Sequence, residues 1–209
     1  MRKRKYVRSK RAFKKSILII CDGITEKHYI ESMKKEVNTQ NYSIRIEPKL
    51  GRSDAFEKVF EDIEDIMDTP KDELPYDLIF YVRDMDTCYR QKKITAYKKL
   101  KKRLLSRPEA KNRLFFIESR PCIEFWFLLH FIKTDRLFNS CSEAEKQLLS
   151  YLTNYEKTEQ YARTVYHDLR PHLQMALDNA DEINSKTRQR EEQYSYSEIN
   201  ELYQKLCAL

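Results

Sequence analysis

Five acidic residues that follow or open apolar segments are the strongest candidates for chemistry in this sequence. Asp22 comes directly after the apolar run at 16–21, and Glu26 follows four residues later. Asp84 and Asp86 follow the apolar run at 77–83, and Glu124 opens the very apolar segment 121–132. Each acid alone is most simply a turn former or a helix cap. Acids at three successive segment ends favour a shared site.

A shared site of this kind predicts a bound cation. Carboxylates brought together raise one another's pKa or destabilise the fold unless a cation is present. Mg²⁺ is commonly held by one or two protein carboxylates together with waters and substrate phosphates. Two such ions can activate water and stabilise the leaving oxygen of a phosphodiester. The five acids therefore favour a Mg²⁺ or Mn²⁺ site with hydrolytic chemistry over separate caps.

An α/β sheet is the element that can bring these acids together. Apolar runs at 16–21, 77–83 and 113–117 predict buried strands, and the alternating segment 42–47 predicts another. The segments 25–37, 54–67 and 94–105 between them read as helices, and Asp54 with Glu57 resembles a capping box. Strands joined by helical crossovers run parallel, so their carboxyl ends share one edge of the sheet.

The rest of the chain reads as helical. Segments 121–132, 142–153, 159–181 and 195–207 predict helices, with a polar break at 184–194. We therefore expect an α/β fold with a mostly parallel four-stranded sheet flanked by helices and a helical C-terminal lobe. Residues 1–15 form a basic tail, 16–134 the α/β core that carries the chemistry, and 135–209 the lobe packed on it.

Positive charge is concentrated in two blocks. The chain of 209 residues has a formal net charge of +7, and residues 1–15 hold nine Lys or Arg and no acid. Residues 89–107 hold nine more, again without an acid. Such blocks are typical of proteins that bind nucleic acid, although a solvated tail and helix face have the same composition. The candidate phosphate contacts of the predicted basic helix and the turn before it are Lys92, Lys93, Lys98, Lys99, Lys101, Lys102 and Arg103.

Other residues favour ordinary roles. Apolar runs are far shorter than the roughly 20 residues of a membrane span, and no signal-peptide stretch follows the N-terminus, so we expect a cytoplasmic protein without a membrane partner. The five cysteines are widely spaced and predict reduced thiols, without a disulfide framework or structural zinc. His28 is expected at the surface, and His130 and Trp126 in the core.

The three acidic segments resemble the RloB family. The resemblance rests on the stretch Ile-Leu-Ile-Ile-Cys21-Asp22-Gly-Ile-Thr-Glu26, on Asp84-Met-Asp86, and on Ser-Arg120-Pro-Cys-Ile-Glu124-Phe-Trp-Phe-Leu-Leu-His-Phe. Its relatives include an AbiL-type abortive-infection component, and RloB-like proteins are similar to Toprim-fold nucleases of the OLD type. The resemblance spans nearly the whole chain, and its last stretch is the most specific.

The resemblance implies roles for individual residues. It implies metal ligation by Asp84 and Asp86, with Asp22 as ligand or general base, and with Glu26 and Glu124 as further acids of the site. The family usually has Glu where this chain has Asp22, and the shorter aspartate side chain reduces the reach of the carboxylate by one methylene. The family commonly has Asn at the position of Arg120. Arg120 would hold the scissile phosphate or neutralise Glu124.

Two functions follow from this sequence. The first is a Mg²⁺- or Mn²⁺-dependent nuclease of DNA or RNA that acts in bacterial antiphage defence, often beside an ATPase encoded next to it. The second is a catalytically weak module that binds nucleic acid or docks on that ATPase. This function is suggested by Asp22, which stands where the family usually has Glu. A phosphotransferase ranks third. The oligomeric state is left open.

Overall fold

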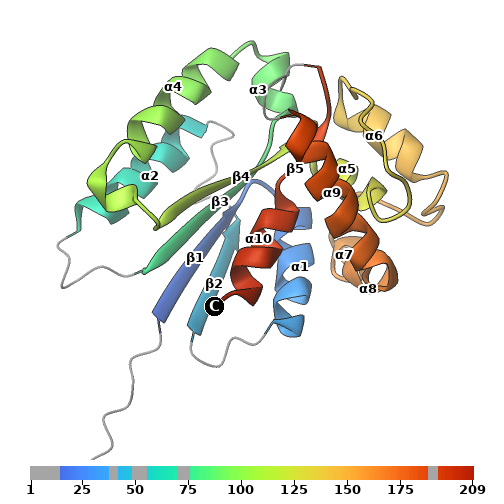
Figure 1. Ribbon diagram of the computed structural model, residues 1–209, viewed down its shortest axis with the longest axis horizontal. Coiled ribbons are helices and arrows are strands. Elements are labelled where there is room, and N and C mark those ends of the chain that lie inside the picture. Colours follow the sequence, from blue (N-terminus) through green and yellow to red (C-terminus); the bar gives the residue numbers. More distant parts are fainter. Residues whose placement is uncertain (1–14, 38–41, 49–55, 70–75, 188–192) are drawn as a thin grey trace, which may run out of the picture.

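The computed structural model describes residues 15–37, 42–48, 56–69, 76–187 and 193–209. Most of the predicted basic tail and Asp54 of the predicted capping box lie outside these residues. Within them, strands and helices alternate as far as the fourth strand, and helices dominate the remainder (Figure 1).

The sheet has five strands in the order β2-β1-β3-β4-β5. Four of them pair in parallel and match the predicted strands, while β5 pairs antiparallel with β4. The fifth strand has two residues and comes from a segment predicted as helix. The predicted α/β class with a mostly parallel sheet is confirmed. The strands are β1(Lys15–Cys21), β2(Tyr42–Pro48), β3(Leu78–Asp84), β4(Leu114–Arg120) and β5(Tyr196–Ser197).

Helices cover both faces of the sheet (Figure 1). The first strands are connected through α1(Ile24–Met33), α2(Phe56–Asp68), α3(Asp86–Arg90) and α4(Ile94–Leu105). The chain then continues through α5(Ile123–Leu128), α6(Cys141–Leu148), α7(Glu159–Ala162), α8(Val165–Leu169), α9(Leu173–Thr187) and α10(Ile199–Cys207). The helix predicted at 159–181 is interrupted, and Pro171 lies in a short 3-10 turn just before α9, because proline cannot donate the backbone hydrogen bond of a helix interior.

Each face of the sheet has its own apolar core. On one face, the side chains of α2 and α4 pack against residues such as Leu18, Ile20 and Tyr81. On the other face, α1 and the helices after β4 pack against Ile17, Ile19 and other buried residues of the strands. Because α5, α9 and α10 contribute to this second core, the C-terminal helices are packed on the sheet.

The strand order places a switch point between β1 and β3. The chain leaves β1 toward β2 on one side, and it later leaves β3 toward β4 on the other. In open α/β sheets, the crevice outside the carboxyl ends of strands at such a point is the usual place for a ligand. Asp22 follows β1 and Asp84 ends β3, so both lie at this position.

Candidate metal centre

The carboxylate of Asp84 lies at the centre of the acidic group. Its Oδ1 accepts a hydrogen bond of 2.9 Å from the backbone N–H of Ile123, in the first turn of α5. The N–H groups of Met85 and Asp86 both donate to the carbonyl of Pro121, at 3.0 and 2.9 Å. These bonds join the ends of β3 and β4, and they hold Asp84 beside the start of α5.

Glu26 reaches Asp84 from the first turn of α1. Its side chain is buried, and its carboxyl group lies close enough to that of Asp84 for the two to influence each other's protonation. Burial, together with the charges of Asp22 and Glu124, raises the pKa of Glu26 to about 7. Gly23 gives this carboxylate its space, since a Cβ at that position would lie 2.7 Å from Glu26 Oε2.

Burial and the neighbouring acids also raise the pKa of Asp84 well above its ordinary value. After burial, the largest causes are the charges of Glu26 and Glu124. Three carboxyl groups from three chain segments therefore repel one another around Asp84. Such an arrangement is stabilised by a proton or by a cation.

Glu124 completes this group from α5 and has two partners that the sequence did not indicate. Its Oε1 accepts hydrogen bonds from Tyr155 Oη at 2.8 Å and from Lys157 Nζ at 2.9 Å. Lys157 Nζ also lies 3.3 Å from Glu145 Oε2. Desolvation lowers the pKa of Lys157, but the charge of Glu124 outweighs it, so this pKa is raised. Lys157 is therefore a charged group at the edge of the site.

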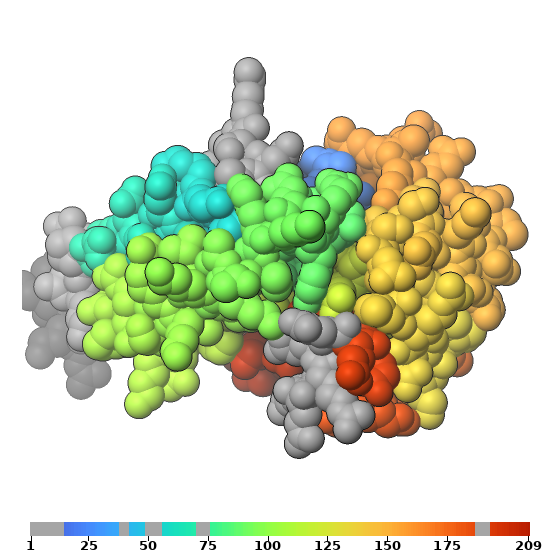
Figure 2. Space-filling model, turned by 90° about the horizontal axis from the view of Figure 1, so that it is seen from above, coloured from blue at the N-terminus to red at the C-terminus, as the bar shows by residue number. Residues whose placement is uncertain are grey.

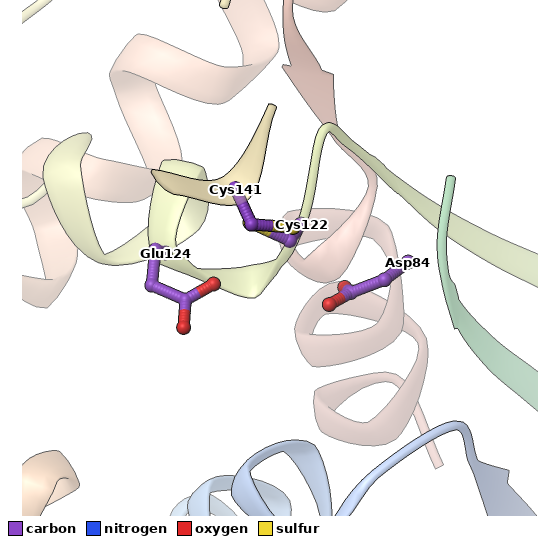
Figure 3. Close-up of side chains that lie close together, drawn as sticks. All are labelled: Asp84, Cys122, Glu124 and Cys141. Atoms are coloured by element: carbon purple, nitrogen blue, oxygen red, sulfur yellow. The ribbon is translucent and has the colours of Figure 1, made fainter. Parts of the chain in front are cut away.

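Two thiols lie beside these carboxylates. Ligand atoms of Asp84, Cys122, Glu124 and Cys141 all lie within 4.8 Å of one another. Figure 3 shows Cys122 and Cys141 side by side, between Asp84 and Glu124. Cys122 is part of the specific Pro-Cys-x-Glu stretch, but Cys141 lies 19 residues further on, where no periodicity or motif points to the site.

Asp22 is close enough to Glu26 to raise its pKa, but its carboxylate is bound to Arg83 and Tyr81. The register pairs Cys21 with Val82, so Asp22 stands beside Arg83 of the neighbouring strand. Its Oδ1 accepts hydrogen bonds from Arg83 Nη1 at 3.1 Å and from Tyr81 Oη at 3.2 Å. Asp22 thus acts on Glu26 and Asp84 through its charge, while its carboxylate is bound to a buried arginine.

Asp86 faces a hollow next to the acidic group. Its Oδ2 lies 3.5 Å from Arg90 Nη1. The hollow has a volume of about 420 Å³ and lies where the green surface of α3 meets the yellow surface near residue 140 in Figure 2. Arg120 also lines it, and its guanidinium lies 3.9 Å from the centre of the Tyr89 ring. The hollow thus combines two arginines with an aromatic ring, beside the acids.

The predicted basic helix is α4, and part of its charge is already neutralised. Lys92, Lys98, Lys99, Lys102 and Arg103 are exposed. Four bases of the block at 89–107 form ion pairs with acids of α2 and β4: Lys93 with Glu57, Lys101 with Glu118, Arg103 with Glu64, and Arg107 with Asp68. The exposed lysines remain the best placed of this block to contact a phosphate backbone.

The histidines differ from the prediction at one position. His28 was expected at the surface, but it is buried, and its Nδ1 lies 3.1 Å from Glu31 Oε2. Its Nε2 lies 3.5 Å from Glu159 Oε1, because α7 packs against α1. The prediction for His130 and Trp126 is confirmed: both are buried, and His130 Nδ1 lies 3.0 Å from the carbonyl oxygen of Trp126.

The stability of the metal-free protein should fall as the pH rises through neutrality. Glu26 has an ordinary pKa of 4.5 and a folded-state pKa of about 7, so the folded state binds more protons between these values. This contribution is fully present below about pH 4.5 and is lost as the pH passes 7, with a size on the order of 3 kcal/mol. Glu26→Gln should remove it, which urea unfolding in EDTA at pH 5 and pH 8 would measure.

Glu61→Gln, at a position of α2 whose side chain is 64% exposed, is the matched control and should keep the pH dependence of the wild type. Equal pH slopes for wild type and Glu26→Gln would show that Glu26 is not the group that titrates.

Comparisons with known proteins identify one family. The model of the RloB-like protein family matches residues 17–206. No curated protein matches the chain, and no solved structure matches it. Among the described residues, every helix is too short or too polar to cross a bilayer.

Proposed function

The chain belongs to the RloB-like protein family, and from this premise we propose that it is a divalent-metal-dependent nuclease. The observation that carries the proposal is the meeting of Glu26, Asp84 and Glu124, which come from three chain segments, at the switch point of the sheet. Mutual repulsion among these groups is what a cation would relieve. Their oxygen atoms suit Mg²⁺ or Mn²⁺.

The residues of the site would divide the work as follows. Glu26, Asp84 and Glu124 would hold the cation, which when bound would polarise the phosphodiester and lower the pKa of water. The pKa of Glu26 is about 7 without a metal, and a bound cation would lower this pKa and keep the carboxylate charged. Arg120 and Arg90 line the neighbouring hollow, where guanidinium groups would bind phosphate oxygens.

Two of the acids expected to be metal ligands, Asp22 and Asp86, receive different roles in this proposal. Asp22 is bound to Arg83, so we assign it an electrostatic and positioning role. Asp86 faces the hollow with Arg90, so it would contact the cation only from the substrate side. An acid after the first strand and an Asp-x-Asp after the third also occur in the Toprim-fold nucleases, and that subtype is part of the proposal.

Metal-dependent cleavage is the direct test. The purified full-length chain is incubated with plasmid DNA, single-stranded DNA and tRNA in Mg²⁺, in Mn²⁺ or in EDTA. We expect cleavage of at least one substrate with a divalent cation and none in EDTA. If the chain needs its partner, the same assay is done with the ATPase encoded next to it. Intact substrates under every one of these conditions would contradict the proposal.

The role in the cell rests on the family resemblance. We propose that the protein acts in the cytoplasm as an effector of antiphage defence, together with the neighbouring ATPase. Cells that express these genes should form fewer phage plaques than cells that carry Asp84→Asn. Sequencing of their nucleic acids during infection would identify the DNA or RNA that is cut.

Exposed lysines of the basic block should set the salt dependence of nucleic-acid binding. Lys92, Lys99 and Lys102 are exposed, and each phosphate contact contributes about 0.9 to the slope of log K against log salt for duplex DNA, or about 0.7 for single strands. Replacing all three with Gln should therefore reduce the slope by about 2 to 3. Fluorescence anisotropy in EDTA at several salt concentrations would measure it.

The matched control is the triple replacement of Lys35, Lys111 and Lys146 with Gln, which removes the same charge from exposed positions elsewhere. It should change the slope much less. A similar reduction in both triple variants would show that only the total charge matters and that α4 is not the binding surface.

One observation favours the second function, a module that binds nucleic acid or docks on the ATPase without catalysis. Asp22 is paired with Arg83, Glu124 with Lys157 and Asp86 with Arg90, so three of the predicted acids have protein cations as partners. This function predicts binding without cleavage and an unchanged phage phenotype for Asp84→Asn. The two functions thus differ in the outcome of the same variant.

A further inference from the structure

The two thiols in the acidic group are the feature that the proposed function leaves unexplained. Cys122 is fully buried and Cys141 is partly exposed, and neither forms a disulfide. A Mg²⁺ site has no use for sulfur, because Mg²⁺ takes oxygen ligands. Thiolates select softer cations, and Zn²⁺ accepts sulfur and carboxylate oxygen together.

We propose that Asp84, Cys122, Glu124 and Cys141 form a binding site for a thiophilic divalent cation, with Zn²⁺ as the best match. The inference rests on the proposed function, because Asp84 and Glu124 serve in both cation sites. It goes beyond that function by assigning a second class of cation and two sulfur ligands. The two classes of cation would then compete for the same carboxylates.

The geometry fits this assignment. Zn²⁺ bonds of about 2.0–2.3 Å in a tetrahedron place the ligand atoms about 3.3–3.8 Å apart. The four donor atoms already lie within 4.8 Å of one another, so a contraction of about 1 Å would close the site. Figure 3 shows that the four side chains gather in one place from the end of β3 and the starts of α5 and α6. Each thiol would release its proton to solvent as its bond to the cation forms.

The secondary structure holds these donors at the required positions. Cys122 and Glu124 lie at the start of α5, and Asp84 is fixed to the same turn by its bond with the N–H of Ile123. Cys141 is the first residue of α6, where Ser140 Oγ accepts a hydrogen bond from the backbone N–H of Glu143. Lys157, the present partner of Glu124, has Glu145 as an alternative acid. A cation could therefore replace Lys157 at Glu124 without leaving the lysine unpaired.

Cobalt spectroscopy tests the proposal directly. The purified full-length protein is freed of metal with a chelator and titrated with Co²⁺. We expect one equivalent to give a thiolate-to-cobalt charge-transfer band in the near ultraviolet, which Zn²⁺ then removes by displacement. Cys141→Ser, Cys122→Ser and the control Cys207→Ser are compared, since Cys207 is exposed and outside the group.

The band should be lost or strongly reduced in both site variants and unchanged in Cys207→Ser. The affinity for Zn²⁺ should fall by about 100-fold or more in the site variants. Loss of a residue that only supports a metal ligand already costs up to about 100-fold, and these variants lose a ligand itself. Because Cys122 is buried and its replacement could unfold the chain, the partly exposed Cys141 carries the decision. A wild type without the band, or a band that persists in folded Cys141→Ser, would overturn the proposal.

The same preparations separate this inference from the proposed function. Cleavage with Mg²⁺ by a wild type that lacks the cobalt band would reject the thiol site and leave the nuclease standing. A cobalt band at Cys141 in a protein that cleaves nothing with any cation would support the thiol site and reject the nuclease.

Discussion

Asp84→Asn should abolish metal-dependent cleavage while leaving the fold intact. The variant removes the charge at the point where Glu26 and Glu124 converge, so the cation loses its central ligand. Stabilisation by a bound cation is worth several kcal/mol in the transition state, so a loss of about 4 kcal/mol corresponds to about 1,000-fold in rate. Single-turnover cleavage with saturating Mg²⁺ would measure it.

The choice of asparagine separates activity from stability. Its amide oxygen can still accept the hydrogen bond from the N–H of Ile123 that Asp84 Oδ1 accepts now. The neutral side chain also relieves the repulsion that raises the pKa of Asp84. Asp84→Asn should therefore be at least as stable as the wild type in EDTA, so a loss of cleavage could not be ascribed to unfolding.

Asp77→Asn is the matched control for this variant. Asp77 immediately precedes the same strand at its opposite end, and its Oδ2 accepts a hydrogen bond from the N–H of Ser16. The same chemical change at this position should leave cleavage unchanged. Full activity of Asp84→Asn, or equal losses in the two variants, would contradict the proposed site.

Arg83→Met should destabilise the protein strongly, because it removes a buried charge that holds several polar partners. The Arg83 side chain is 1% exposed, and its guanidinium donates to Asp22, to Tyr81 Oη at 2.6 Å and to Cys88 Sγ at 3.3 Å. Removing one partner of a buried ion pair leaves the other charge uncompensated and costs about 3–5 kcal/mol. Urea unfolding at constant m-value would measure this loss.

The aromatic surroundings of Arg83 add to this expectation. Its guanidinium carbon lies 5.2 Å from the ring centre of Phe56 and 5.4 Å from that of Tyr97. Cation–π contacts of a desolvated arginine contribute on the order of 2 kcal/mol. Methionine would keep apolar packing against these rings but none of the charge.

Two comparisons decide whether the ion pair is the cause. Arg90→Met removes the same charge from a side chain that is 68% exposed, and it should change stability by less than about 0.5 kcal/mol. Adding Asp22→Asn to Arg83→Met removes the unpaired charge and should restore part of the loss. Equal effects of the two single variants, or no recovery in the double variant, would count against the pair.

The sequence predicted the strands well because their physics is local. Continuous apolar runs predicted β1, β3 and β4, and the alternation of side chains predicted β2. The segments 54–67 and 94–105 were likewise predicted as helices, and they form α2 and α4. The prediction of one long helix at 159–181 was wrong. This segment forms shorter helices, because α7 and α8 pack against α1 and Pro171 interrupts the helical hydrogen bonds before α9. The strand β5 was missed because two residues carry no detectable period.

The site was predictable in part for the same reason. The carboxyl ends of parallel strands share one edge, so Glu26, Asp84 and Glu124 could be expected together before any coordinates. The sequence did not separate Asp22 from these three acids. Successive side chains on a strand point to opposite faces, so the neighbours of a side chain depend on the register between strands, which the sequence does not show. The register places Asp22 beside Arg83, and a shift of one residue would have turned it to the other face.

The sequence by itself determined the α/β class, the edge that gathers the acids, and the uneven distribution of positive charge, because each depends on neighbours along the chain. Only the tertiary structure decided which side chains face one another across that edge. It places the thiol of Cys141 near that of Cys122, pairs Lys157 with Glu124, and buries His28 against α7. These contacts arise from the packing of helices far apart in sequence, and no local pattern of residue types records them.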